Sequence, residues 1–378
     1  MQTYIVSDNI ISPLGTTTAE NFENVVQGKS GIKLIDSDLS STGSFYASAI
    51  SDVVAGYSLE IDSNTRFERI CINSITDALS RSGINGSEAD TIFILSTTKG
   101  NIELIQNSNG ADVTARVLLE HTAGQIASHF HSPNKPIIVS NACISGVLAI
   151  IMAKRLLESG KYRHAVVVGA DILSDFVVSG FQSLMAMSDE PCRPFDKDRK
   201  GINLGEGAAT VIMTTDKNLT NSQSILVMGE GISNDANHIS GPSRTGQELA
   251  DAVSKSLRKS NIDVNALSFI SSHGTATIYN DEMESKAFDL VGLNEVPLHS
   301  LKAYFGHTLG AAGVIESIMT IESLRRKSIL SSLNFDQIGV PKSLNVNVEF
   351  KSSDKYHALK TASGFGGCNA ALVYSSQQ

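Results

Sequence analysis

Short apolar runs and segments with helical spacing alternate along the whole chain. The apolar runs predict strands buried on both faces, and they lie at residues 4–6, 91–96, 137–139, 165–169, 225–228, 267–271 and 297–301. The intervening segments predict helices at 18–27, 64–82, 115–130, 247–259, 281–290 and 310–325. Residues 37–56 are rich in Ser, Asp and Gly and are expected to be irregular. This alternation predicts an α/β fold with mainly parallel central sheets packed in layers with helices.

The second half of the chain repeats the element order of the first. Gly205–Glu206–Gly207 leads into the apolar run that closes the first half, and Gly364–Phe365–Gly366–Gly367 leads into the run that closes the chain. One such echo is weak evidence, but together with the matched element order it indicates a duplication. We therefore expect two duplicated α/β halves, residues 1–220 and 221–378, joined near the polar stretch 217–224.

Composition and charge narrow the class of protein. The 378 residues are 41% hydrophobic and carry a net charge of -9 with no basic block, which argues against general nucleic-acid binding. The start of the chain has no basic and apolar leader, and the longest apolar segment is broken by Lys154 and Arg155, so we expect a cytoplasmic protein without a membrane span. The four cysteines are scattered without metal-type spacing, which suits free thiols in a reducing compartment.

Cys143 stands at a sharp turn between a predicted strand and a long apolar helix. The run 137–139 ends in Ser140–Asn141–Ala142–Cys143, and the apolar segment behind it ends at Ser159–Gly160, where a glycine can terminate a helix. A thiol at the positive end of a helix dipole is favoured as thiolate. The alternative is that Cys143 is one more small buried hydrophobic residue. Its local sequence leaves both interpretations open.

His273 and His307 share the placement of Cys143. Each follows an apolar run and has a glycine beside it, which permits close approach of backbone or ligand. Singly, each is more often a structural or surface histidine. A Cys/His/His set could also bind zinc, but these ligands would come from three distant turns with no short-range pair to start the site. Nucleophilic attack by Cys143 on a thioester, with imidazole N–H groups binding a developing oxyanion or enolate, fits better, and we expect no metal.

Two further features accompany these residues. Glu316 lies inside a strongly apolar helical segment, so it needs a buried partner, and Lys302 is the candidate; a surface Glu316 on an amphipathic helix is the alternative. The loop Gly364–Phe365–Gly366–Gly367 lacks the Lys-Ser/Thr of a phosphate-binding loop. We interpret it as a loop of close backbone approach, whose amides could form an oxyanion hole with the Cys143 amide and whose Phe365 ring could gate a pocket.

These motifs, taken in order, resemble the β-ketoacyl-[acyl carrier protein] synthases, condensing enzymes of the thiolase superfamily. The resemblance covers almost the whole chain and rests on IISPLG and GKSGI near the start, SNACISG around Cys143, CRPFDKDRKGINLGEGAA at 192–209, SHGTATIYNDEMES at 272–285, SLKAYFGHTLGAAGVIE at 300–316 and SGFGGCNAALV at 363–373. It implies a thiolase-like fold of two duplicated halves.

The resemblance also implies roles for the residues singled out above. Cys143 would accept the acyl group as a thioester. His273 and His307 would bind the malonyl thioester carbonyl and stabilise the enolate formed on decarboxylation. Lys302 and Glu316 would hold the network around His307. The Cys/His/His set is similar to that of the elongating synthases.

The remaining implied sites contact the substrate arm. Thr275 and Thr277 would contact the phosphopantetheine of an acyl carrier protein, Phe365 would gate the pocket, and Gly364 and Gly366 would lie against the substrate. No metal or redox cofactor is implied, since the substrates arrive on the carrier protein. The family is dimeric, so a homodimer or a pair with a related subunit is expected.

Some positions depart from the family pattern and bear on the substrate. Ser363 replaces an aromatic residue, and Asn280 stands where fatty-acid enzymes usually have glycine and is more similar to aromatic-polyketide and aryl-polyene synthases. The prediction is decarboxylative condensation in fatty-acid, polyketide or aryl-polyene type biosynthesis. The alternatives are a non-catalytic, chain-length-factor-like subunit and a CoA-dependent thiolase, which would use a second cysteine near the position of Cys368. Arg66 and Arg69, predicted on an exposed helix face, are the candidate docking site for an acidic carrier protein.

Overall fold

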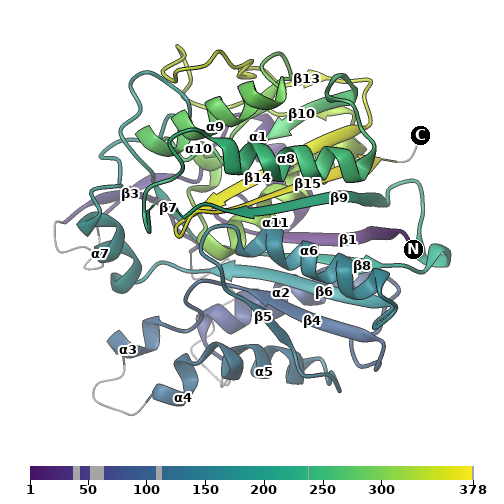
Figure 1. Ribbon diagram of the computed structural model, residues 1–378. Helices are drawn as coiled ribbons and strands as arrows, with labels where there is room; N and C mark the ends of the chain where they lie inside the picture. Colours follow the sequence, from purple (N-terminus) through teal and green to yellow (C-terminus); the bar gives the residue numbers. More distant parts are fainter. Residues whose placement is uncertain (37–42, 52–63, 108–112, 237, 377–378) are drawn as a thin grey trace.

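The computed structural model describes residues 1–36, 43–51, 64–107, 113–236 and 238–376 (Figure 1). Its strands are β1 (Thr3–Ile11), β2 (Lys33–Ile35), β3 (Phe45–Ser48), β4 (Thr91–Ser96), β5 (Ile137–Val139), β6 (His164–Asp171), β7 (Leu204–Gly205), β8 (Gly207–Thr214), β9 (Ile225–Asn234), β10 (Leu267–Ser271), β11 (Leu298–His299), β12 (Ser328–Ile329), β13 (Lys351–Ser352), β14 (His357–Gly364) and β15 (Cys368–Ser376).

The helices alternate with these strands. They are α1 (Thr18–Val26), α2 (Arg66–Ser80), α3 (Glu103–Asn107), α4 (Thr114–Val117), α5 (Leu119–His129), α6 (Ser145–Glu158), α7 (Asp175–Ser183), α8 (Gln247–Ser260), α9 (Ile278–Val291), α10 (Lys302–Phe305) and α11 (Ala312–Arg325), with short 3-10 turns η1 (Lys217–Leu219), η2 (Val264–Ala266) and η3 (Leu309–Ala311). Among the helices in the described part of the chain, none is both long and apolar enough to cross a membrane.

The main sheet is built from two halves with the same topology. Its order is β11-β10-β14-β15-β9-β1-β8-β6-β4-β5. Numbered in chain order within each half, the strands run third, second, fourth, fifth, first in both, and the halves join where Tyr4 of β1 pairs with Leu226 of β9. The predicted α/β fold with two duplicated halves is therefore confirmed. The expectation of mainly parallel sheets is wrong, because the sheet is mixed: its two ends are parallel, as β4 with β5 and β10 with β11, whereas its middle is antiparallel.

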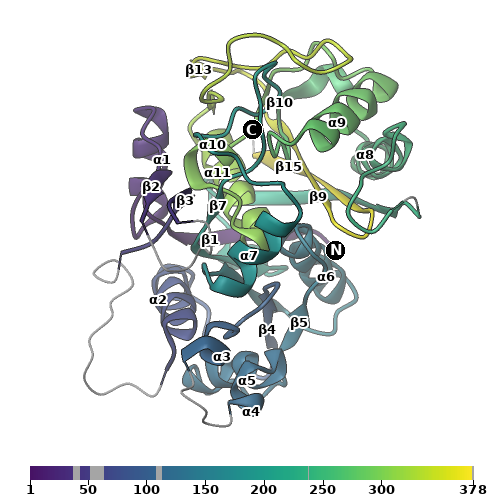
Figure 2. The same ribbon diagram turned by 90° about the vertical axis from the view of Figure 1, so that its left-hand side faces the viewer.

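Helices α6 and α11 lie side by side between the two halves of the sheet (Figures 1 and 2). Each contacts strands of both halves, while α2 covers the outer face of the first half and α8 that of the second. The layers therefore alternate between helix and sheet. The central helices are apolar nearly all round, as expected for helices packed on every side.

The two central helices touch backbone to backbone at a pair of glycines. A methyl group added at Gly146 of α6 would lie 2.7 Å from the Val314 nitrogen, and one at Gly313 of α11 would clash with the Val147 nitrogen. These contacts involve main-chain atoms, which move less readily than a flexible side chain. The close crossing fixes the start of α6, and with it the turn that carries Cys143, against the segment that follows His307.

Substituting Gly313 by alanine is expected to lower the free energy of unfolding by about 2 kcal/mol or more, because the added methyl overpacks the helix crossing. Gly124→Ala is the matched control. It lies in helix α5, and a methyl group added there would have no atom of the described residues within 4 Å, so better helix propensity should stabilise it by about 0.5–1 kcal/mol. Chemical denaturation of both variants measures the difference. Equal effects of the two substitutions would contradict the close crossing.

The structure also departs from the expected elements. The segment 43–51, expected to be irregular, contains β3, which pairs with β2 and with β7; the expectation for 37–42 and 52–56 lies outside the described residues. The helix expected at 115–130 is divided at Leu118, whose backbone is extended. Helix α7 was not predicted. Its Phe181 side chain proves important at the site described next.

Candidate active site

Three turns bring Cys143, His273 and His307 together. Cys143 lies between β5 and α6, His273 follows β10, and His307 follows α10. The Sγ atom and one ring nitrogen of each histidine all lie within 4.8 Å of one another. The two imidazole rings meet edge to face with centroids 5.2 Å apart. All three side chains are buried and line a cavity of about 430 Å³.

Strained backbone accompanies each of these turns. Ala142, Ala276 and Leu309 have positive φ values of 45°, 63° and 49°. Residues with side chains rarely adopt this conformation, and it persists only where the surrounding structure holds it. One strained residue directly precedes Cys143, and the other two lie within three residues of His273 and His307. The strain belongs to the turns that aim the three side chains into the cavity.

The resting state of Cys143 differs from the sequence expectation. Burial raises the pKa of its thiol to about 12, although the nearby ammonium of Lys302 and a hydrogen bond from the Phe365 amide act in the opposite direction. The predicted resting thiolate is therefore wrong, since desolvation outweighs the favourable charges. Attack by this sulfur requires a base that takes the proton as the new bond forms.

Both histidines are held in the neutral form. Burial lowers the pKa of His273 and His307 well below the ordinary value, and the positive charges of Lys302 and Lys360 lower it further. His307 Nδ1 accepts a hydrogen bond from the Leu309 amide at 3.3 Å, so a neutral His307 carries its proton on Nε2. His307 Nε2 and His273 Nδ1 are buried without a partner among the described residues. They are free to bind a substrate.

A buried carboxylate lies between two buried lysines behind the histidines. The Lys302 ammonium pairs with Glu316, as the sequence predicted, and donates to the His273 carbonyl at 3.1 Å. The other Glu316 oxygen lies 2.7 Å from Lys360 Nζ, an ion pair without hydrogen-bond geometry. Lys360 was missed at the sequence level. The available signal was a single charged residue inside the otherwise uncharged strand segment 358–364.

Two buried acids, Asp281 and Glu284, accept hydrogen bonds from the backbone of the turn after His273. Asp281 accepts hydrogen bonds from the Thr275 amide at 3.0 Å and the Phe195 amide at 2.7 Å, and Glu284 accepts one from the Gly274 amide at 3.0 Å. Burial raises the pKa of Asp281 to about 6 and that of Glu284 to about 8, the latter with a contribution from Asp281. Glu284 therefore takes up a proton near neutral pH.

Glu284→Gln should remove the decrease in the free energy of unfolding that the Glu284 carboxyl group causes as pH rises. A carboxyl group whose pKa is higher in the folded chain than its unfolded value of 4.5 stabilises the fold most at low pH, and this contribution is lost as pH rises through about 8. We expect the variant to be more stable than the parent by about 2 kcal/mol at about pH 9 and to show no gain at about pH 5. Denaturant unfolding at both pH values measures this. Glu282→Gln, on the same helix but 34% exposed, is the control and should show no such pH dependence.

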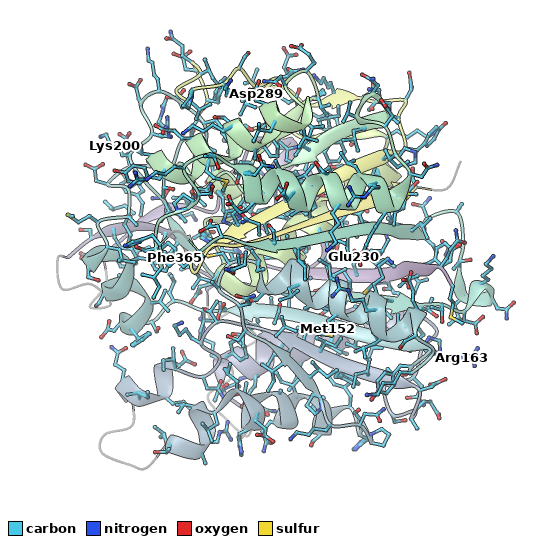
Figure 3. The ribbon with its side chains drawn as sticks, viewed as in Figure 1. Met152, Arg163, Lys200, Glu230, Asp289 and Phe365 are labelled. Carbon is cyan, nitrogen blue, oxygen red and sulfur yellow. The ribbon has the colours of Figure 1, made fainter. Side chains whose placement is uncertain are left out.

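The glycine loop approaches Cys143 closely. A methyl group at Gly364 would lie 3.0 Å from the Cys143 nitrogen, so a side chain there would crowd the Cys143 backbone. The Phe365 amide points at the Cys143 sulfur. The Phe365 ring stacks on Phe181 of α7 with centroids 5.9 Å apart, and Figure 3 places it at the tip of the β14–β15 hairpin. Phe181 was not anticipated from the sequence, because α7 was not predicted.

Of the four further predicted substrate contacts, Thr275, Thr277 and Gly364 line the same cavity, whereas Gly366 is not among its lining residues. The hydroxyl groups of Thr275 and Thr277 are 2.8 Å apart. Gly366 lies at the hairpin turn with φ of 83°, and its amide donates to the Ile239 carbonyl.

The predicted docking pair is not on an open surface. Arg66 makes two hydrogen bonds to Glu206, at 2.8 and 2.9 Å, and its side chain is only 17% exposed. Arg69 is also partly buried. The prediction of an exposed helix face is therefore wrong. The helix face is covered because the segment 205–209 places Glu206, which is 140 residues from Arg66 in the sequence, against it.

The three converging side chains could also reach one metal ion. The surroundings do not suit a divalent cation, because the ammonium groups of Lys302 and Lys360 already place positive charge near the neutral histidines. The arrangement suits a developing negative charge instead. A buried thiol, two neutral imidazoles with unpaired nitrogens and two amides near the sulfur can bind and polarise a thioester.

Comparison with known families agrees with this chemistry. The family model for the beta-ketoacyl synthase N-terminal domain matches residues 3–218, and that for the beta-ketoacyl synthase C-terminal domain matches residues 225–336. The chain belongs to the beta-ketoacyl synthase family. The resemblance stated from the motifs is thereby confirmed, and the protein is an acyltransferase-type condensing enzyme.

Individual relatives of this synthase are distant but cover 97–100% of its length. A 3-oxoacyl-[acyl-carrier-protein] synthase 2 from Vibrio cholerae is 28% identical, over 97% of this chain and 96% of the relative. A ketosynthase from Xenorhabdus doucetiae, solved in complex with its chain length factor, is 25% identical with a TM-score of 0.85, covering 100% of this chain and 98% of the other. A beta-ketoacyl synthase from Burkholderia phymatum has the same fold, with a TM-score of 0.88 at 24% identity and complete coverage of both chains.

Proposed function

We propose that the protein catalyses decarboxylative Claisen condensation of malonyl-[acyl carrier protein] with an acyl group held as a thioester on Cys143. The observation that carries this proposal is the meeting of the Cys143 sulfur with two neutral imidazoles in the wall of one cavity. Each group has a task in one half of the reaction.

In the first half, the acyl group moves from the carrier protein to the enzyme. The Cys143 sulfur attacks the thioester carbonyl, its proton passes to His273, and the amides of Cys143 and Phe365 bind the oxyanion. The carbon–sulfur bond to phosphopantetheine breaks, and the leaving thiolate takes the proton back from His273. His273 suits this task because no described neighbour occupies its Nδ1.

In the second half, malonyl carrier protein occupies the same cavity. The N–H groups of His307 and His273 bind its thioester carbonyl. The bond to the carboxylate carbon breaks, CO2 leaves, and the electron pair remains as an enolate stabilised by those N–H groups. The enolate carbon attacks the acyl carbonyl on Cys143. The tetrahedral intermediate collapses to the 3-oxoacyl carrier protein and a Cys143 thiolate, which takes a proton from solvent.

The proposal includes the way in which substrates arrive. Both would be carried on the phosphopantetheine arm of an acyl carrier protein, with Thr275 and Thr277 along the cavity wall, and no metal or redox cofactor would take part. We also propose a homodimer or a pair with a related subunit. The Xenorhabdus relative, which is bound to its chain length factor, supports the second arrangement.

For the pathway, we propose polyketide or aryl-polyene type biosynthesis rather than housekeeping fatty-acid synthesis. The two departures from the fatty-acid pattern, Asn280 and Ser363, both line the cavity. Asn280 donates hydrogen bonds to Asp281 and Glu284, each at 3.2 Å, and so connects the cavity wall to the acids beneath the His273 turn.

The test is condensation with defined substrates. The purified protein is given malonyl carrier protein with either a saturated or a polyunsaturated acyl carrier protein, and mass spectrometry follows both the acyl group on Cys143 and the product. We expect a 3-oxoacyl product in which two carbons have been added and CO2 lost, with the polyunsaturated acyl group preferred. A preference for the saturated group would contradict the pathway. Absence of any acyl-Cys143 or product would contradict the enzymatic proposal and favour the chain-length-factor-like alternative.

A further inference from the structure

Lys360 is a fully buried lysine that the catalytic scheme above does not use. It lies in the middle of β14 with 0% of its side chain exposed. Its ammonium donates to the carbonyls of Ser271 at 3.2 Å, Ser272 at 3.3 Å and Thr361 at 2.6 Å. It also pairs with Glu316 at 2.7 Å. A lysine is rarely buried so completely unless it is paired, and here every donor has an acceptor.

The contacts of Lys360 lead directly to the histidines. Ser271 ends β10, Ser272 follows it, and His273 is the next residue. Lys302 holds the His273 carbonyl. The two ammonium groups therefore donate hydrogen bonds to three consecutive carbonyls, those of Ser271, Ser272 and His273. These carbonyls lie immediately before the turn that lines the cavity.

The buried cluster of Lys302, Lys360 and Glu316 carries a net charge. Lys302 and Lys360 share the single carboxylate of Glu316, so the three side chains together carry one excess positive charge. The other titratable groups that face Lys360 are Glu284, which takes up a proton near neutral pH, and His299, which burial keeps neutral. Without Lys360 the remaining pair, Lys302 with Glu316, would be neutral overall.

We propose that Lys360 is a positioning residue for the condensation: it anchors the end of β10 that bears His273 and supplies the excess positive charge behind the histidine pair. This inference rests on the proposed function for its effect on turnover, but not for its effect on the histidines themselves. Its chemical consequence is that both imidazoles remain neutral hydrogen-bond donors down to low pH, because a positive charge nearby opposes their protonation.

The sign of the expected effect follows from that charge. Loss of the ammonium removes one of the causes that lower the pKa of His273 and His307. Both values then rise, the imidazoles become protonated at higher pH, and decarboxylation fails sooner as pH falls. We expect the acid limb of the rate profile to move up by about one pH unit.

The experiment compares the parent with three variants, using malonyl carrier protein and CO2 release from about pH 4 to about pH 9. Lys360→Gln keeps two of the three donors but removes the charge, and should move the acid limb upward. Glu316→Gln combined with Lys360→Gln restores the single excess charge, so its acid limb should return toward the parent position whatever its turnover. Lys154→Gln is the control: it removes a buried lysine paired with Glu158 at 2.7 Å on α6 and should leave the limb in place.

A second readout is independent of turnover. Nitrogen NMR of labelled histidine follows the protonation of His273 and His307 in the same four proteins, so the inference stays testable if no substrate is turned over. A raised pKa of both rings in Lys360→Gln, reversed in the double variant, supports the proposal. Unchanged imidazole titration in a folded Lys360→Gln protein overturns it, and so does a shift that the double variant fails to reverse, since that would indicate a purely structural role.

Discussion

Replacement of Cys143 by alanine is expected to abolish the covalent acyl intermediate and to lower condensation by about four orders of magnitude or more. The sulfur is the nucleophilic atom in the proposal, and the described cavity wall offers no second thiol to replace it. The two histidines and the glycine loop remain in the variant, so substrate binding should persist. Intact-protein mass spectrometry after incubation with acyl carrier protein measures the intermediate, and single-turnover kinetics measure the product.

The matched control for this variant is Cys368→Ala. Cys368 lies close behind Gly364, and its Sγ is 3.3 Å from the Phe365 carbonyl, but it is not among the residues that line the cavity. Acylation and condensation should survive its substitution. Condensation by Cys143→Ala would refute the nucleophile. Loss of condensation in Cys368→Ala with retained acylation would favour a thiolase, which would use a second cysteine.

Replacement of His307 by alanine is expected to separate the two halves of the reaction. The Nε2–H group of His307 is proposed to hold the malonyl carbonyl, and loss of one such donor typically costs two to three orders of magnitude, about 10²–10³-fold in rate. CO2 release from malonyl carrier protein should fall by about that factor. Transfer of the acyl group to Cys143 should fall far less, because His273 and the oxyanion amides remain.

A buried histidine away from the cavity provides the control for that experiment. His164 starts β6, and its Nδ1 lies 2.9 Å from the Thr214 hydroxyl. His164→Ala carries a comparable loss of packing, so it separates destabilisation from chemistry. Full retention of decarboxylation in His307→Ala would refute the proposed role, as would equal losses in both variants.

The electrostatics of the site explain why these effects should be large. The thiol of Cys143 and both imidazoles are uncharged at rest because burial disfavours their charged forms. The charges that remain, on Lys302, Lys360 and Glu316, are fixed by one another and by backbone carbonyls. A negative charge that develops in the cavity therefore meets a preorganised positive environment without prior rearrangement.

The amino-acid sequence by itself determined most of the elements and the identity of the reacting groups. Strands such as 91–96 and 267–271 were predicted at their observed bounds, because an uninterrupted apolar run is a local property of the chain. Cys143, His273 and His307 were selected because each stands at a turn after such a run. Their convergence depends on the tertiary structure, because β5 and β10 lie in different halves of a sheet whose middle is antiparallel and run in opposite directions, so they share no parallel edge.

Only the tertiary structure decided what surrounds those groups. Arg66 looked exposed on its helix until Glu206, far away in sequence, was seen to cover it. Lys360 was not singled out from the sequence, and only the structure places Glu316 and the end of β10 around its ammonium. Cys143 was expected to be a thiolate, but burial raises its pKa and keeps the thiol protonated. In each case the deciding quantity is desolvation or ion pairing by segments distant in the chain, which local periodicity does not encode.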